Sequence, residues 1–228
     1  MYYQRRAVVP KVTILLLLAN VLCYLCELHI GIDRAAGIYG MYQGAFMQQQ
    51  YLRGLFSGFM HFDILHLLSN MLCLMIYGLI LERNIGAWRF LGLYAGGLVG
   101  SSVLINFAGA SGIHMGASGA IWGLMTGMLV YSLKNHISPY YALRGIIINL
   151  IYSFGYGVSW QGHIGGGIGG LLIALILFRS RPVYQQSYVV HSDQPWRLSK
   201  ASRFRKAKDK QKYMDRLDEY PDDGHYHP

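Results

Sequence analysis

The amino-acid sequence predicts an all-α membrane protein, and its composition supplies the main evidence. Of the 228 residues, 53% are hydrophobic and only 14% are charged, whereas soluble domains are about 25% charged. Residues 90–133 and 145–178 form stretches of 44 and 34 residues without Asp, Glu, Lys or Arg. A helix that crosses a hydrocarbon layer of about 30 Å needs about 20 mostly apolar residues, so each stretch is long enough for two crossings. These features exclude a water-soluble fold and a disordered chain.

Six transmembrane helices, packed as a bundle, account for the apolar segments. The first has a charge-free stretch of only residues 12–26, so its flanking side chains must reach out to the interface. Glycine-rich segments at 109–119 and 155–162 separate the third helix from the fourth and the fifth from the sixth. The long aromatic loop at 28–60 is expected outside, partly in the membrane interface. The helices are expected at residues 11–27, 63–81, 88–107, 117–133, 141–154 and 163–178.

Lys and Arg lie near one set of helix ends, which predicts the orientation of the chain. The opposite set has only Arg34 and Arg53, so both termini are expected in the cytosol. The chain then divides into a cytosolic N-terminus (1–10), a membrane domain (11–180) and a basic and acidic cytosolic tail (181–228). No small-x-small cleavage site follows the first apolar stretch, which is therefore expected to be an uncleaved helix. The basic set is Arg5, Arg6, Lys11, Arg83, Arg89, Lys134, Arg144, Arg179 and Arg181.

Net charge and cysteines have less specific interpretations. The net charge of +9 comes from helix ends and the tail, a layout typical of membrane topology and not of nucleic-acid binding. Cys23, Cys26 and Cys73 lie in apolar segments and are expected to be small buried hydrophobic residues. The CxxC that the first two form has no second pair, which disfavours a zinc or redox site.

Polar side chains near the start of the second, fourth and sixth helices are costly in a membrane, so they are candidates for function. Asp63 is expected to cap the second helix, which places His66 and Asn70 one turn apart on one face. Ser118 and His163 stand at the start of the fourth and sixth helices. Because these helices all cross from outside to inside, their first turns lie at one depth near the outer face. The four polar side chains are therefore expected to converge.

Glycines recur at intervals of four after Ser118 and around His163. Such repeated GxxxG patterns let two helix backbones approach closely in lipid. Alone they would indicate only helix packing, but here close packing would bring the Ser118 hydroxyl to a ring nitrogen of His163. The glycines are Gly119, Gly123 and Gly127 in the fourth helix and Gly162, Gly166 and Gly170 in the sixth.

A serine beside a histidine is the arrangement used in nucleophilic acyl transfer. The imidazole takes the hydroxyl proton as the serine oxygen attacks a carbonyl carbon. No acidic residue is expected as a third member, because Glu82 lies at the cytosolic end of the second helix and Asp63 serves as a cap. The sequence therefore predicts a dyad, with the side chains of His66 and Asn70 and the backbone N–H of the serine as donors to the oxyanion.

Three motifs on alternate helices resemble those of the rhomboid family of intramembrane serine proteases. HFDILHLLSN at 61–70, GASG at 116–119 and GHIGGGIGG at 162–170 match the family's HFxxxHxxxN, GxSG and catalytic-histidine motifs, and the resemblance covers about residues 52–178. The resemblance implies a six-helix bundle with a water-filled cavity open to the outside. It also implies hydrolysis of peptide bonds in or near transmembrane segments. By the same resemblance Ser118 is the nucleophile, His163 is the base, and His66 and Asn70 are oxyanion ligands. The supporting residues it implies are His61, Gly116, Gly119 and Trp122. Glu82 and Gly86 match the family's ExxxG motif that follows the second helix.

The sequence departs from the family pattern at two places. The Trp-Arg pair often found in the first loop is replaced by Leu52 and Arg53. The tyrosine usually found four residues after the nucleophile is replaced by Trp122, which can stack on His163 but offers no hydroxyl.

The sequence thus predicts a serine endopeptidase that acts through an acyl-enzyme without a metal or cofactor. Its expected partners are the lipid bilayer and transmembrane protein substrates. A bacterial inner membrane is the expected location, with the site towards the outer face. His114, in the glycine-rich loop near Ser118, is expected to be an exposed loop residue rather than part of the substrate mouth.

Two alternatives stay open. A catalytically silent rhomboid-like protein would bind transmembrane segments without cutting them, and it should have lost Ser118 or His163. A histidine-lined transporter of a metal or solute would use His61, His66, Asn70 and His163 as ligands. His61 and His66 are poorly spaced for one metal ion if both are helical.

Overall fold

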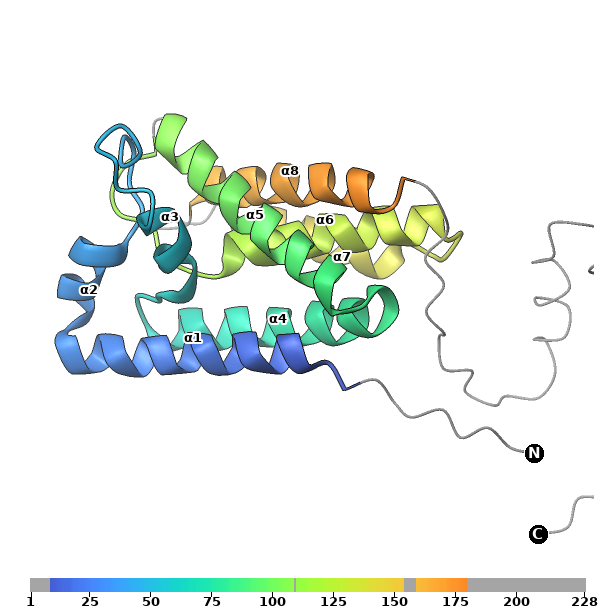
Figure 1. Ribbon diagram of the computed structural model, residues 1–228, viewed down its shortest axis with the longest axis horizontal. Helices are drawn as coiled ribbons and strands as arrows, with labels where there is room; N and C mark the ends of the chain where they lie inside the picture. The colour runs from blue at the N-terminus through green and yellow to red at the C-terminus, as the bar shows by residue number, and fades with distance from the viewer. Residues whose placement is uncertain (1–8, 109, 154–158, 180–228) are drawn as a thin grey trace, which may run out of the picture. The chain divides into compact units, whose positions relative to one another are not determined.

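The computed structural model describes residues 9–108, 110–153 and 159–179, and in this part of the chain the regular structure is helical, apart from an isolated bridge between Met41 and His114. The predicted tail at 181–228 and most of the predicted N-terminal segment lie outside the described residues. Figure 1 shows the elements, which are α1 (Lys11–Ile30), α2 (Ile32–Tyr39), α3 (Arg53–Phe56), η1 (Ser57–Phe59), α4 (Ile64–Ile85), α5 (Ala87–Phe107), α6 (Ser118–Lys134), α7 (Tyr140–Ser153) and α8 (Trp160–Leu177).

Six of these helices coincide with the six predicted ones. α1, α4, α5, α6, α7 and α8 begin and end within four residues of the predicted bounds, and four of them (α1, α4, α5 and α8) are long and apolar enough to cross a membrane. α6 and α7 are shorter, with 17 and 14 residues. Twelve residues of α6 are buried, so this helix lies inside the bundle and the others cover it. The fold is that of an all-α membrane protein, and the number of crossings stays a prediction.

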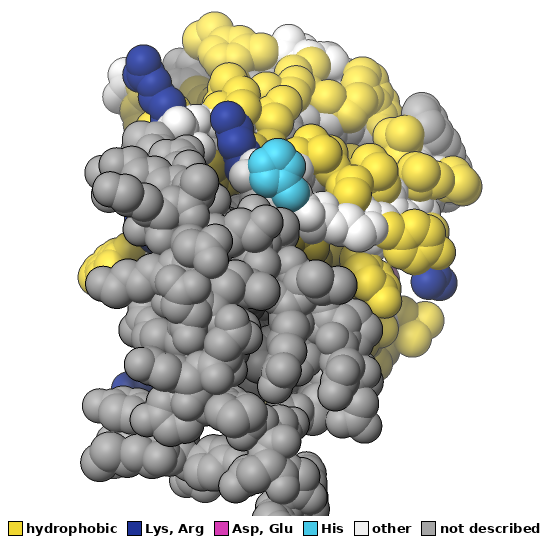
Figure 2. Space-filling model, turned by 90° about the vertical axis from the view of Figure 1, so that its right-hand side faces the viewer, with side chains coloured by type: hydrophobic (Ala, Val, Ile, Leu, Met, Phe, Trp, Pro, Cys, Tyr) yellow, Lys and Arg dark blue, Asp and Glu magenta, His cyan; other side chains and the backbone are white. Residues whose placement is uncertain are grey.

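The surface of the bundle has the character expected of a membrane protein. Large apolar side chains stay exposed along its helices, for example Leu15 of α1 and Leu65 of α4, with 63% and 74% of their surface exposed. Basic residues mark the end where α1 and α5 begin and α4 and α6 finish, namely Lys11, Arg89, Arg83 and Lys134. Figure 2 shows Lys and Arg side chains among apolar ones on the described surface. This arrangement is typical of the positively charged side of a membrane helix bundle.

α6 and α8 pack by direct backbone contact at glycines. A Cβ built on Gly166 of α8 would lie 2.1 Å from the carbonyl oxygen of Gly119 of α6. A Cβ on Gly170 would lie 2.3 Å from the Cα of Gly123. No side chain fits at either contact, so the predicted close approach of these two helices is confirmed.

α5 is the third member of this glycine-lined packing, and the sequence analysis did not anticipate it. A Cβ on Gly100 of α5 would lie 2.3 Å from the carbonyl oxygen of Gly165 of α8. Gly127, which the GxxxG pattern assigns to the contact between α6 and α8, instead lies against Leu93 of α5, whose Cδ1 would be 2.6 Å from its Cβ. α5, α6 and α8 therefore pack as a closely spaced group of three helices.

Buried carboxylates hold α1 against α4 at both ends. Glu82, 2% exposed, accepts hydrogen bonds from the backbone N–H groups of Val12 (2.9 Å) and Thr13 (2.7 Å) and from the Thr13 hydroxyl (2.7 Å). These N–H groups lie in the first turn of α1, which has no acceptors for them within the helix. At the opposite end Glu27 of α1 accepts the N–H of His61, just before α4, with N–O distances of 3.1 and 3.0 Å.

The loop between α2 and α3 is tied to the bundle by backbone and guanidinium hydrogen bonds. Arg53 donates to the carbonyl oxygens of Gly40 and Gly37, both at 2.8 Å, and its guanidinium lies 5.1 Å from the ring centre of Tyr42. Met41 exchanges two backbone hydrogen bonds with His114, 2.9 and 2.7 Å long. The loop is therefore anchored to the segment that leads into α6.

We expect Gly166→Ala to destabilise the protein by about 1–3 kcal/mol, the usual cost of overpacking a core, because its methyl group would meet the Gly119 carbonyl. Equilibrium unfolding in detergent micelles measures this free energy. Gly37→Ala is the matched control, because a Cβ on Gly37 of α2 meets nothing within 4 Å. Equal stability of the two variants would contradict backbone contact between α6 and α8.

We expect Glu82→Gln to lower the free energy of unfolding by about 1–3 kcal/mol, since an amide loses the charge that stabilises the α1 N-terminus and one of the two accepting oxygens. The control is Asp33→Asn, which removes an exposed acid in the first turn of α2. That change should cost less than about 1 kcal/mol. Equilibrium unfolding in detergent micelles measures both variants. If Glu82→Gln lowers the free energy of unfolding no more than Asp33→Asn does, Glu82 does not cap α1.

Candidate active site

Ser118 is the first residue of α6 and follows a loop shaped by glycine. Gly112 and Gly116 have φ angles of 82° and 131°, which residues with a side chain rarely adopt. The N–H of Gly116 donates to the carbonyl of Ser57 (2.9 Å) and so holds the loop against η1. The first N–H groups of α6 have no acceptor within the helix. The positive end of the helix dipole therefore lies beside the Ser118 hydroxyl.

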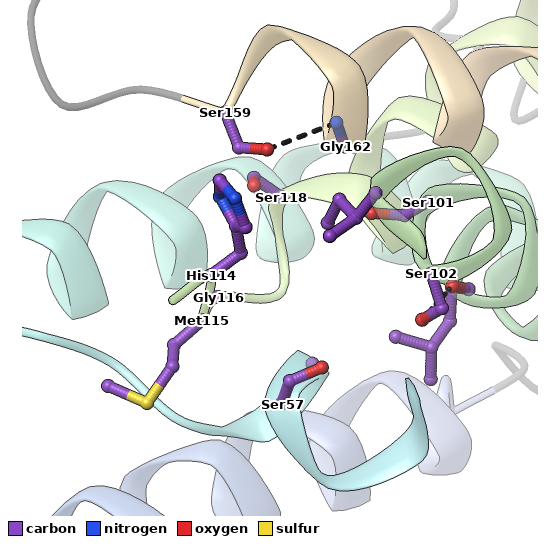
Figure 3. A pocket seen from close by; sticks show the side chains of 12 residues that line it. Ser57, Ser101, Ser102, His114, Met115, Gly116, Ser118, Ser159 and Gly162 are labelled. Atoms are coloured by element: carbon purple, nitrogen blue, oxygen red, sulfur yellow. Dashed lines mark hydrogen bonds between the residues drawn. The ribbon is translucent and has the colours of Figure 1, made fainter. Parts of the chain in front are cut away.

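A cavity of about 30 Å³ lies beside Ser118 (Figure 3). A water molecule needs about 10–15 Å³ of such volume, so the cavity has room for about two. The hydroxyl groups around it suit water better than an apolar ligand. The polar side chains in its lining are those of Ser57, Ser101, Ser102, His114, Ser118 and Ser159.

His66 and Asn70 of α4 lie against the loop that precedes Ser118. A Cβ on Gly116 would be 2.8 Å from Cε1 and Nε2 of His66 and 3.6 Å from Nδ2 of Asn70. Asp63 accepts the N–H of His66 (2.8 Å) and caps α4 as predicted. Nδ2 of Asn70 is buried and has no hydrogen-bond partner among the described residues. The pair thus presents an unused donor next to the start of α6.

His163 lies in the first turn of α8, and its ring contacts α6 and α7. Ser159 caps α8 by accepting the N–H of Gly162 (3.2 Å). The His163 ring, 5% exposed, stacks on that of Trp122 of α6, with ring centres 5.6 Å apart and planes 24° apart. Its Nδ1 lies 2.5 Å from the hydroxyl oxygen of Ser153, the last residue of α7. The imidazole is therefore held between α6 and α7.

The structure brings Ser118, Trp122, His66, Asn70 and His163 to the same end of α4, α6 and α8. It does not show the expected hydrogen bond between Ser118 and His163. Within the described residues, the imidazole hydrogen bond is to Ser153. A bond between nucleophile and base is often longer in a ligand-free protein than in the reacting complex.

His61 lies behind the site. It is fully buried, and its ring is edge-on to that of His66 with centres 5.1 Å apart. Burial, followed by the nearby His66, lowers the pKa of His61 to about 3, so its ring is neutral at physiological pH. The side chain therefore packs beneath His66 and does not line the cavity.

The prediction for His114 is wrong. Its side chain is half-buried and lines the cavity together with Ser118, as Figure 3 shows. The backbone bonds to Met41 hold it there, and burial lowers the pKa of the ring below its ordinary value. A histidine in a loop is expected to be exposed. Here the loop that contains Met41 packs against His114, and no pattern in the sequence near His114 indicates this contact.

The sequence analysis missed several hydroxyl groups of the site. Ser101 and Ser102 lie in the long uncharged part of α5, and Ser153 is the last residue of α7. The cost of polar groups in a membrane, applied to His66 and Asn70, also points to these serines. Serine gives a weaker signal because its hydroxyl can bond to its own helix, as Ser102 does with the carbonyl of Leu98 (3.0 Å).

No group of three or more His, Cys, Asp or Glu side chains within the described part of the chain has the geometry to hold a metal ion. The three cysteines are free thiols. The prediction that they are buried is wrong, since Cys23 and Cys73 are half-buried and Cys26 is exposed. α1, which carries two of them, lies at the edge of the bundle and leaves one face uncovered.

Comparison with known proteins places this arrangement in a family. A model of the rhomboid domain matches residues 48–180. The chain is 36% identical over 125 residues to "Rhomboid protease GluP" of Bacillus subtilis, which covers 52% of this chain and 24% of that protein. It is 33% identical over 132 residues to "RHOMBOID-like protein 1" of Arabidopsis thaliana, covering 55% and 34%.

A fungal protein adds a third example. "Rhomboid-type serine protease 2" of Emericella nidulans is 30% identical over 139 residues, which cover 58% of this chain and 28% of that protein. The chain thus spans about a quarter to a third of the length of these relatives. The domain match extends from the loop before α3 to the end of α8 and contains all of the site residues described above. The chain belongs to the rhomboid family.

Proposed function

We propose that this protein is an intramembrane serine endopeptidase that hydrolyses peptide bonds in or near transmembrane segments of other membrane proteins. The observation that carries the proposal is the meeting of three helix ends at one place. Ser118 heads α6, the imidazole of His163 stacks on Trp122 one turn further along that helix, and Asn70 of α4 offers a free donor beside the loop.

In the proposed reaction Ser118 is the nucleophile and His163 the general base. The Ser118 oxygen bonds to the scissile carbonyl carbon as the His163 ring takes the hydroxyl proton, and the imidazolium then gives that proton to the leaving amine. This leaves an acyl-enzyme on Ser118. A water molecule, deprotonated by the same imidazole, hydrolyses it and restores the serine.

The negative charge that develops on the carbonyl oxygen requires fixed donors. The side chains of His66 and Asn70 and the first N–H groups of α6 supply them in this proposal. Asn70 is suited to the role because its Nδ2 is buried and bonds to no other described group. A donor that needs no rearrangement stabilises the transition state more than one that must first break another bond.

The proposal includes a location and a domain division. The basic end of the bundle is assigned to the cytosol, α1, α4, α5, α6, α7 and α8 cross the membrane, and the site lies towards the outer face. Residues 11–180 form the membrane domain, and residues 1–10 and 181–228 are cytosolic. A bacterial inner membrane is the proposed membrane, and transmembrane proteins are the proposed substrates.

We expect Ser118→Ala and His163→Ala each to abolish proteolysis, because the dyad has no spare nucleophile or base. Labelling of the purified protein by a fluorophosphonate tests the nucleophile without a known substrate, and cleavage of single-span fusion proteins tests the activity. Ser132→Ala, which removes a buried serine near the opposite end of α6, is the control and should keep both. Labelling of the Ser118→Ala protein at the wild-type rate would reject the dyad, and absence of both activities from the wild type would favour a silent binder.

We expect Asn70→Ala to lower turnover by about 10- to 1,000-fold, the usual range for one oxyanion donor. Asn84→Ala is the matched control, since Asn84 lies at the far end of the same helix, is half-buried, and among the described residues bonds to the carbonyl of Ile80 and weakly to Tyr131. The turnover number of both variants is compared with wild type on one substrate. Equal rates in the two variants would remove Asn70 from the oxyanion site.

A further inference from the structure

The His163 ring is held by a residue that the dyad leaves out. Ser153 is 3% exposed, and its hydroxyl oxygen lies 2.5 Å from Nδ1 of His163. Ser153 belongs to α7, so the bond joins that helix to the imidazole on α8. A buried polar group in a membrane domain is costly unless it is bonded, and this bond satisfies both groups.

The position of the hydroxyl proton determines the direction of the bond. The Ser153 oxygen also lies 2.6 Å from the backbone carbonyl oxygen of Asn149, one turn earlier in α7. A carbonyl oxygen only accepts, and a serine has a single hydrogen to donate. Two oxygens at 2.6 Å without a hydrogen between them would repel each other, so Ser153 donates to Asn149. It must then accept a hydrogen bond from Nδ1 of His163.

This direction fixes the tautomer of the imidazole. A neutral ring carries one proton, and a proton on Nδ1 leaves Nε2 with the free electron pair. Only the nitrogen with the electron pair can act as a base. The stack with Trp122 holds the plane of the ring, and the bond to Ser153 selects which edge of the ring faces α7.

We propose that Ser153 is a positioning residue that keeps Nδ1 of His163 protonated and leaves Nε2 ready to take the Ser118 proton. The inference rests on the proposed function. Ser153 occupies the place that a carboxylate fills in three-membered serine protease sites, where the third group holds the histidine in the correct tautomer. A neutral hydroxyl stabilises the imidazolium less than a carboxylate, but it introduces no charge into the membrane domain.

The sharpest test compares Ser153→Thr with Ser153→Val, because the two side chains have the same shape and only threonine keeps the hydroxyl. The rate constant for fluorophosphonate labelling of Ser118 is the readout. A small reagent reacts without a bound transmembrane segment, so the rate reports on activation of the serine. We expect Ser153→Thr to stay within about 3-fold of wild type and Ser153→Val to fall by about 10- to 100-fold, as for loss of a hydrogen bond to a group that becomes charged.

Two further measurements separate positioning from folding. The unfolding temperatures of Ser153→Ala and Ser132→Ala should be similar, since both remove a buried serine hydroxyl, whereas only Ser153→Ala should slow labelling. On a cleaved substrate the loss should appear in kcat and not in KM. If the extra methyl group slows both Ser153→Thr and Ser153→Val equally, the labelling rate of Ser153→Ala decides.

Labelling of Ser153→Val or Ser153→Ala at the wild-type rate would overturn this inference and leave the proposed function intact. A change in KM alone would also overturn it, because Ser153 would then act in substrate access. Failure of the wild-type protein to be labelled at Ser118 would instead overturn the proposed function, and the role of Ser153 with it.

Discussion

Backbone contact between glycines brings the two halves of the site together. Helices with ordinary side chains pack with axes 8–10 Å apart, and small residues allow a closer approach. At Gly119 and Gly166 the main chains of α6 and α8 touch directly, and Gly123 and Gly170 repeat the contact one turn further on. Trp122 lies between these two levels of α6, where its ring reaches that of His163. The glycines, which have no side chains, thus let α6 and α8 come close enough for the rings of Trp122 and His163 to stack.

A second constraint is the cost of polar groups in an apolar bundle. The structure meets it by giving such groups hydrogen-bond partners, such as the first turn of α1 for Glu82 and the carbonyl of Asn149 for Ser153. Asn70 is one of several exceptions, with a buried donor that bonds to no described group. Buried polar atoms of Asn20 and Asn106, away from the candidate site, also lack a partner among the described residues. A free donor therefore points to a site only together with its position, which for Asn70 is beside the loop that leads into α6.

The sequence predicts the helices well because their signal is local. Apolar stretches, glycine-rich breaks and basic residues at one set of ends can be read without knowing which helices touch. The placement of His66, Asn70, Ser118 and His163 at one end of the bundle was also predicted, since they share a depth in helices that run in the same direction. The contacts of Ser153 and His114 were not predicted, because each depends on a neighbour more than nine residues away that no periodic pattern reveals. The part of α5 in the glycine packing was missed for the same reason.

The way α1 is held has a consequence for how this protein tolerates change in length. Glu82 and Glu27 both accept hydrogen bonds from main-chain N–H groups. Every residue except proline supplies such a group, so most substitutions at Val12 keep the hydrogen bond to Glu82. One residue inserted into α1 between these two points would advance the helix by 1.5 Å and turn it by about 100°. The hydrogen bonds of Glu82 and of Glu27 could not then both form. Insertions and deletions in α1 should therefore be far rarer among functional descendants of this chain than replacements on its lipid-facing side.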